Sequence, residues 1–292
     1  MLGNGRNRKW AAGVVAVATV LMVAAAALPR LHAEDDPVRT ETWDYVASSK
    51  EIAKKFTGKE GVVVHMGDSI TYANPYSAWA RYGKGKTEDD KRILAWSHCG
   101  KEDDTDGWFL AHHDEPTGRS DTAASGVRSD EYIKGGKGGL PPLDELIKKY
   151  NPQMVVLMLG TNDIDGGRKV ADIIKDMTTI IDKLHANGTI VILSSIPPNF
   201  GHIQETQDYN AALYKLAEEK KMPFLDFYGH ILKLEPGMAW NGTILTKNGV
   251  HPTANDSAGE PTDENFKKSG YLLRGWLSVE KILEVHDKIW GK

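Results

Sequence analysis

The chain has 292 residues, of which 40% are hydrophobic and 26% are charged, and its formal net charge is -4. This composition is typical of a soluble, enzyme-sized protein, and its acidic balance argues against nucleic-acid binding, which needs a basic face. The single cysteine, Cys99, excludes an internal disulfide.

The N-terminus resembles an export signal. Arg6, Arg8 and Lys9 precede an apolar run over residues 11–28, and residues 31–33 offer a small-residue cleavage site. We therefore predict a signal peptide over residues 1–33 and a periplasmic or extracellular protein. An apolar run of about 18 residues can also span a bilayer, so an uncleaved membrane anchor through residues 11–28 is the alternative.

Residues 34–292 are enough for one α/β domain with a substantial core. Continuous apolar strands alternate with amphipathic helices, a pattern that predicts a three-layer α/β/α sandwich with a mostly parallel, flavodoxin-like sheet. We expect strands over 62–64, 154–159, 189–193 and 223–227, and helices over 40–56, 141–150, 170–185, 204–221 and 267–290.

Residues 74–124 give the weakest pattern, and we expect a second strand there, over either Ile93–Trp96 or Trp108–Ala111. The run from His112 to Glu115 contains residue types that bind metals. Adjacent residues rarely converge on one ion, so a surface loop is the preferred interpretation.

Two polar residues follow apolar strands. Gly67 ends the first strand, and Ser69 stands at the start of the next helix, where backbone N–H groups have no intrahelical partner and can face a developing negative charge. Asn162 occupies the same place after the strand over 154–159. Each residue taken alone also fits an ordinary role, a turn for Ser69 and a helix N-cap for Asn162.

Together these segments make the chain resemble the SGNH (GDSL) family of esterases, lipases and acyl hydrolases. The match spans most of residues 34–292, and its four blocks are Gly67-Asp68-Ser69-Ile70, Ala124-Ser125-Gly126, Gly160-Thr161-Asn162-Asp163 and Val250-His251-Pro252. The glycine block matches least well, because no clear apolar strand leads into it.

The resemblance implies a serine esterase that uses no metal or cofactor. Ser69 would be the nucleophile and His251 the base, and the oxyanion hole would comprise the Ser69 N–H, the Gly126 N–H and the Asn162 amide.

One position departs from the family. Where the family usually has an aspartate three residues before the histidine, this chain has Asn248. Three interpretations remain open: a Ser–His dyad supported by Asn248 or a backbone carbonyl, another acid such as Asp256 or Asp263, or a domain that binds without hydrolysing.

The expected function is an exported esterase for short-chain acyl esters of small molecules or carbohydrates, with sugar O-acetyl groups as first choice. Four tryptophans are candidates for stacking on sugar rings, although isolated tryptophans more often belong to a core: Trp79, Trp96, Trp108 and Trp240. The alternative from another class is a catalytically weakened SGNH domain that binds glycans or cell-surface partners. Membrane association is expected only if the N-terminal segment is uncleaved.

Overall fold

The computed structural model describes residues 37–113 and 118–291, which belong to one unit by their contacts. The predicted signal peptide, its anchor alternative over residues 11–28, and part of the histidine-containing run lie outside these residues. Within the described part of the chain, no helix is both long and apolar enough to cross a membrane.

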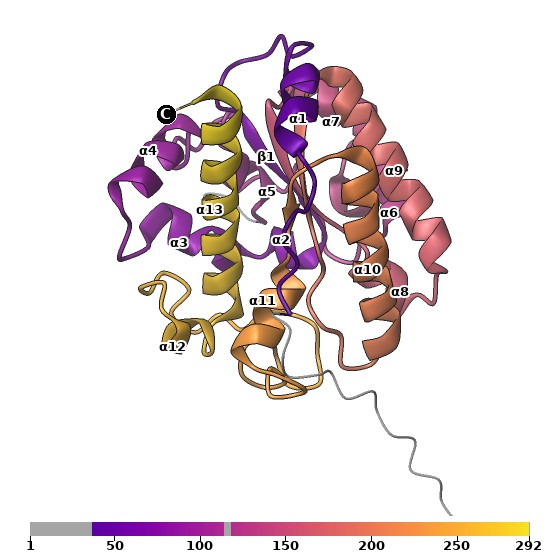
Figure 1. Cartoon of the computed structure of the whole chain (residues 1–292), viewed down its shortest axis with the longest axis vertical. Helices are drawn as coiled ribbons and strands as arrows, with labels where there is room; N and C mark the ends of the chain where they lie inside the picture. The colour runs from indigo at the N-terminus through magenta and orange to yellow at the C-terminus, as the bar shows by residue number, and fades with distance from the viewer. Residues whose placement is uncertain (1–36, 114–117, 292) are drawn as a thin grey trace, which may run out of the picture. The chain divides into compact units, whose positions relative to one another are not determined.

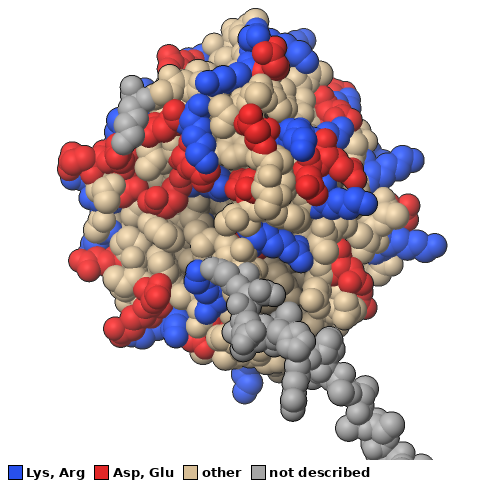
Figure 2. Space-filling view, viewed as in Figure 1, with Lys and Arg blue, Asp and Glu red and all other residues tan. Residues whose placement is uncertain are grey.

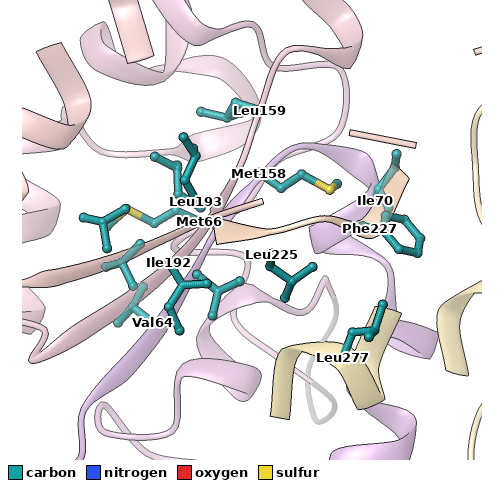
Figure 3. Packing of buried hydrophobic residues seen from close by; sticks show 14 of the residues in the cluster. Val64, Met66, Ile70, Met158, Leu159, Ile192, Leu193, Leu225, Phe227 and Leu277 are labelled. Atoms are coloured by element: carbon teal, nitrogen blue, oxygen red, sulfur yellow. The ribbon is translucent and has the colours of Figure 1, made fainter. Parts of the chain in front are cut away.

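Four parallel strands form the sheet, in the order β1 (Val63–Gly67), β2 (Met154–Met158), β3 (Ile190–Ser194) and β4 (Phe224–Leu225). Every strand residue is buried, because helices cover both faces. Figure 3 shows the resulting core, in which side chains such as Met66, Ile192 and Leu225 pack together. The predicted α/β class and parallel sheet are confirmed.

Helices connect successive strands. α7 (Leu143–Tyr150), α9 (Val170–Asn187) and α10 (Ile203–Lys220) lie in right-handed crossovers, which place them on one face of the sheet. α1 (Tyr45–Ala53) and α13 (Gly270–Trp290) contact each other, and the strands lie between α13 and the α9–α10 pair in Figure 1.

The remaining helical segments are short and mostly belong to loops: α2 (Ser69–Tyr72), η1 (Asn74–Ser77), α3 (Ala78–Tyr82), α4 (Glu88–Trp96), α5 (Gly107–Ala111), α6 (Ser129–Lys134), η2 (Lys137–Gly139), α8 (Thr161–Asp165), α11 (Phe227–Leu234) and α12 (Asp263–Phe266). Positive and negative side chains intermingle on the face shown in Figure 2.

Both candidates for the second strand were wrong, because Ile93–Trp96 lies in α4 and Trp108–Ala111 lies in α5. Thr87 and Asp90 form a capping box that starts α4, and Asp106 accepts hydrogen bonds from the first turn of α5. Among the described residues, only a single parallel bridge, between Gly67 and Ala123, pairs with the outer edge of β1.

The start of α5 covers this edge at very short range. A Cβ atom added to Gly107 would lie 1.7 Å from the Val63 carbonyl oxygen, so only glycine allows the helix to come this close. Beyond that contact, the hydroxyl of Thr122 donates to the His65 carbonyl at 2.8 Å. A helix and a hydroxyl therefore occupy much of the edge where a full second strand was expected.

Some helix and strand ends also differ from the prediction. α1 begins at Tyr45 rather than at residue 40, because Asp44 caps it. β4 is shorter than expected because Asp226 caps α11 directly after it, and α13 begins at Gly270 after the Ser269 cap.

Candidate active site

Ser69 is the first residue of α2 and follows β1 at the carboxyl edge of the sheet. Its Oγ lies 2.9 Å from His251 Nε2. Asp68 caps the helix by accepting a hydrogen bond from the Ile70 N–H at 3.0 Å. Burial raises the pKa of Asp68 to about 6, against the opposing effect of that hydrogen bond. The strand, the turn and the cap together fix the position of the Ser69 hydroxyl.

His251 lies in the long loop between α11 and α12, where short backbone pairings hold it. The Thr246 N–H donates to the His251 carbonyl at 2.8 Å, and the next residue, Pro252, is buried and bridges to Leu245. The imidazole reaches the surface, yet partial desolvation lowers its pKa below the usual value. The ring is therefore neutral near pH 7 and can accept a proton.

Gly126 and Asn162 come from different segments at the same edge. Asn162 lies in α8, directly after β2, and its Nδ2 donates to the Val127 carbonyl at 3.1 Å and lies 3.4 Å from Asp68 Oδ2. Gly126 has a φ of 73°, in the left-handed region that favours glycine. Among the hydrogen bonds of the described residues, none occupies the backbone N–H of Ser69 or Gly126.

A buried polar network joins the loop that contains Gly126 to the segment that contains Asn162. Asp163 accepts hydrogen bonds from the Ser129 N–H at 2.9 Å and from the Ser129 hydroxyl at 2.7 Å. The Arg168 guanidinium pairs with Asp163 and also with Asp176 at 2.7 Å. Both segments are thereby fixed to the start of α9.

Asn248 does not hydrogen-bond to His251 in the described part of the chain. Its side chain is exposed and accepts from the Asn241 amide at 3.2 Å, and its own N–H donates to Asn241 at 2.7 Å. Neither Asp256 nor Asp263 forms a hydrogen bond with His251 either. The structure thus brings together Ser69, His251 and the segments with Gly126 and Asn162, while none of the three acid-position candidates hydrogen-bonds to the imidazole within the described part of the chain.

Asp165 is a charged residue that sequence reasoning did not single out and that acts on His251. It is the one charged group that raises the pKa of His251, against the larger lowering by desolvation. Asp165 ends α8, three residues after Asn162, and accepts a hydrogen bond from the Asn199 amide at 2.6 Å. Its place two residues after the asparagine block was visible in the sequence, but the action of its charge on a histidine from another loop was not.

No group of three or more potential metal ligands occurs among the residues that the structure describes. His112 is the C-cap residue directly after α5 and is buried rather than exposed in a surface loop. The His113 ring lies 5.0 Å from the Tyr72 ring. Asp114 and Glu115, also part of the metal alternative, lie outside the described residues.

A cavity of about 410 Å³ lies between the segment that follows Ser69 and the segment that follows His251. One side is formed by residues shortly after Ser69 and the other by residues shortly after His251, and the lining comprises Asn74, Pro75, Ser77, Ala78, Arg81, Tyr82, His112, Ala254, Asp256, Ser257 and Ala258. The Ser77 hydroxyl is buried without a hydrogen-bond partner among the described residues, and the Tyr82 side chain is 69% exposed.

Three of the four tryptophans considered for sugar stacking are core residues. Trp79, Trp108 and Trp240 are each at most 1% exposed. Trp96 packs against His286 and Trp290, with ring centroids 4.5 and 6.0 Å apart. Tyr82, which we had not singled out, is instead the exposed aromatic residue at the cavity.

The parallel sheet with helices on both faces and the Ser69–His251 pair at its carboxyl edge define a protein of the GDSL hydrolase class. The chain belongs to the GDSL-like lipase/acylhydrolase family, whose model matches residues 65–255.

Individual relatives agree with this assignment. Esterase TesA of Pseudomonas aeruginosa is 28% identical over 117 residues, which cover 39% of this chain and 55% of the relative, so the match spans about half of that protein. A GDSL-like lipase from Bacteroides thetaiotaomicron is similar with a TM-score of 0.50 at 19% identity, covering 82% of this chain and 99% of that one. A mutant acetyl esterase whose structure contains an acetate ion is similar with a TM-score of 0.51 at 17% identity, covering 76% of this chain and 98% of that one. At these identities, the two structures establish the shared fold.

Proposed function

We propose that this protein hydrolyses short-chain acyl esters through an acyl-enzyme formed on Ser69. The observation that carries the proposal is the 2.9 Å contact between Ser69 Oγ and His251 Nε2 at the carboxyl edge of the sheet. A serine hydroxyl within hydrogen-bond distance of a neutral imidazole can lose its proton as it attacks a carbonyl.

The reaction then proceeds in two half-steps. As Ser69 Oγ bonds to the ester carbon, its proton moves to His251 Nε2, and the carbonyl oxygen becomes an oxyanion. Collapse of this intermediate breaks the bond to the alcohol oxygen, which takes the proton from His251. A water molecule, deprotonated by His251, repeats the sequence and releases the acid from Ser69.

The oxyanion is stabilised by the Ser69 N–H, the Gly126 N–H and the Asn162 amide. The two backbone N–H groups donate to no other described residue, which supports this role. Asn162 has two amide protons, one held by Val127 O at 3.1 Å and the other directed at Asp68 over a long 3.4 Å contact. The weaker contact is the one that can be exchanged for an oxyanion.

Asp165, rather than Asn248, supplies the negative charge that favours the imidazolium. Its effect on the pKa of His251 supports this assignment, and the pairing of Asn248 with Asn241 leaves that side chain otherwise engaged. Asp165 acts at a distance as a positioned charge, so the proton chemistry belongs to a Ser–His dyad.

The alcohol part of the substrate is a carbohydrate that occupies the 410 Å³ cavity. The leaving alcohol must lie near His251, which protonates it, and the cavity adjoins the segment after that histidine. Its lining provides polar groups such as Asn74 and the Ser77 hydroxyl, which has no hydrogen-bond partner among the described residues, and Tyr82 offers an exposed aromatic face on which a sugar ring can stack.

The protein acts outside the cytoplasm, with residues 1–33 as a cleaved signal peptide. The basic residues, the apolar run and the small-residue site in the sequence support this. Mass spectrometry of the secreted or periplasmic protein should find a chain beginning near Glu34. An intact Met1 in the membrane fraction would establish an anchor instead.

Covalent labelling tests the central proposal. A fluorophosphonate should modify Ser69, and labelling should fall sharply in His251→Ala because the base is lost. Hydrolysis of p-nitrophenyl acetate should disappear in Ser69→Ala. Unchanged labelling or turnover in Ser69→Ala would overturn the assignment, and a folded wild-type protein inactive in both assays would favour the glycan-binding alternative.

Tyr82→Ala tests the sugar site separately. We expect a several-fold rise in KM for an acetylated oligosaccharide, while kcat/KM for p-nitrophenyl acetate stays within twofold, because the small ester does not reach the cavity. Equal changes for both substrates would contradict the placement of the sugar.

A further inference from the structure

The segment Gly135–Gly139 is a tight loop with one charged side chain. Its four glycines all have positive φ values, 74° at Gly135, 93° at Gly136, 59° at Gly138 and 83° at Gly139. Other residues adopt such angles only with strain. Lys137 is the one residue of the loop with a side chain, so the backbone geometry presents a single ammonium group.

The loop packs against the segment that contains Gly126. A Cβ atom added to Gly138 would lie 2.9 Å from the Ala124 Cβ, so glycine is needed for this close approach. A Cβ on Gly135 would lie 2.4 Å from the Pro142 nitrogen, which fixes the other end of the loop against the start of α7. The position of Lys137 is therefore set by contacts on both sides.

Lys137 lies beside one of the proposed oxyanion-hole donors. A Cβ atom built on Gly126 would be 3.7 Å from Lys137 Cε and 4.0 Å from its Nζ. Because a Cβ lies about 2.5 Å from the nitrogen of its own residue, the ammonium group is within roughly 6.5 Å of the Gly126 N–H. A substrate held at that N–H thus lies within reach of the lysine.

The charge of Lys137 is uncompensated within the described part of the chain. The side chain is exposed and forms neither an ion pair nor a hydrogen bond with a described residue. The neighbouring Lys134, by contrast, pairs with Asp130 at 3.3 Å. A flexible, hydrated ammonium group is a point charge rather than a preorganised oxyanion donor. Its position suits recognition of a charge that the substrate already has.

We propose that Lys137 selects esters that have a carboxylate near the scissile carbonyl. The inference rests on the proposed Ser69 esterase function and adds a specificity-determining residue to that site. Attraction between exposed charges is modest and depends on salt. Lys137 should therefore change the preference between substrates by a limited factor without being required for turnover.

Two esters of matched length test the proposal. The p-nitrophenyl hemiester of succinate has a free carboxylate, whereas p-nitrophenyl butyrate has the same number of acyl carbons and no charge. We expect Lys137→Met to lower the ratio of kcat/KM for succinate over butyrate about two- to fivefold, Lys137→Glu to lower it further, and Lys137→Arg to retain it. The wild-type ratio should fall as salt is raised from 20 to about 500 mM.

Lys175→Met is the matched control, because it removes the same charge from an exposed position on α9 and should leave the ratio unchanged. Melting temperatures of all variants exclude a loss of folded protein. Equal losses for both esters in Lys137→Met would overturn the inference and assign the lysine to the oxyanion or to loop structure. An unchanged ratio would overturn it as well. If the wild-type protein hydrolyses p-nitrophenyl butyrate and the ratio does not change when Lys137 is substituted, only this inference is contradicted. If the wild-type protein hydrolyses neither ester and a fluorophosphonate does not label Ser69, the proposed function is contradicted as well.

Discussion

Asp163 accepts two hydrogen bonds from Ser129, one from the backbone N–H at 2.9 Å and one from the hydroxyl at 2.7 Å. This pair joins the loop after Gly126 to the residue after Asn162. Two proposed oxyanion donors from distant parts of the sequence are thus held by one buried carboxylate, which is itself paired with Arg168.

Ser129→Ala should loosen this connection. The hydroxyl bond to the buried charge is lost while the N–H bond remains, so we expect a decrease of about 1.5–3 kcal/mol in the free energy of unfolding. A several-fold fall in kcat should accompany it, because the donors are less well fixed. Urea titration and steady-state kinetics measure both. Thr179→Ala, which removes only a hydroxyl bonded within α9, is the control, and an equal effect there would contradict the prediction.

Asn162→Ala removes a side-chain donor from the proposed oxyanion hole. We expect kcat to fall by about 10²–10³, with KM less affected, because the lost interaction forms mainly in the transition state. The comparison variant is Asn255→Ala. Asn255 lies in the loop after His251, and its side-chain amide donates to the Lys268 carbonyl, away from the proposed oxyanion hole. A fall in kcat/KM that arises only from KM would assign Asn162 to ground-state binding.

The pH dependence of the hydrolysis rate should reflect the ionisation of His251. Desolvation lowers the pKa of this ring, so the rate should rise with pH through a value below 6.5 and then become level. Asp165→Asn removes the charge that raises this pKa, and the acidic limb should therefore move to still lower pH. At the same time the plateau kcat should fall about three- to tenfold, because the imidazolium in the transition state is less stabilised. A limb that stays in place would exclude Asp165 as the charge acting on His251.

Asn248→Asp tests whether the absence of the family's usual aspartate at this position limits activity. Because Asn248 pairs with Asn241 rather than with His251, we expect kcat/KM to change by less than twofold. Fresh protein of verified mass is needed, since an Asn-Gly sequence deamidates slowly. A gain of tenfold or more, about 1.4 kcal/mol, would show instead that the lost charge limits the enzyme.

The strands and the residues that follow them could be predicted because both signals are local. A buried parallel strand requires a continuous apolar run, as in β2, and the residue after it must lie at the carboxyl edge, where Asn162 is found. The short helices α4 and α5 were mistaken for strands because each is too short to show a helical period. The Thr87–Asp90 capping box was the signal that could have identified α4.

The parts that could not be predicted depend on contacts between distant segments. Nothing near Asp165 in the sequence indicates that its charge acts on a histidine in the loop before α12. Lys137 likewise lies beside Gly126 only because Gly138 packs against Ala124. The pairing of Asn248 with Asn241 requires the loop to fold back on itself, which the spacing to His251 does not reveal.

The close fit of Gly107 against Val63 bears on how the protein avoids associating with itself. In the part of the chain that the structure describes, only one bridge pairs with the outer edge of β1, and an uncovered edge of five buried strand residues would be a template for pairing with another chain. The start of α5 and the Thr122 hydroxyl occupy that edge instead. Any side chain at residue 107 would push the helix away from the Val63 carbonyl. The expected damage is then intermolecular: strand-to-strand aggregation during folding, in molecules whose Ser69 and His251 are chemically intact.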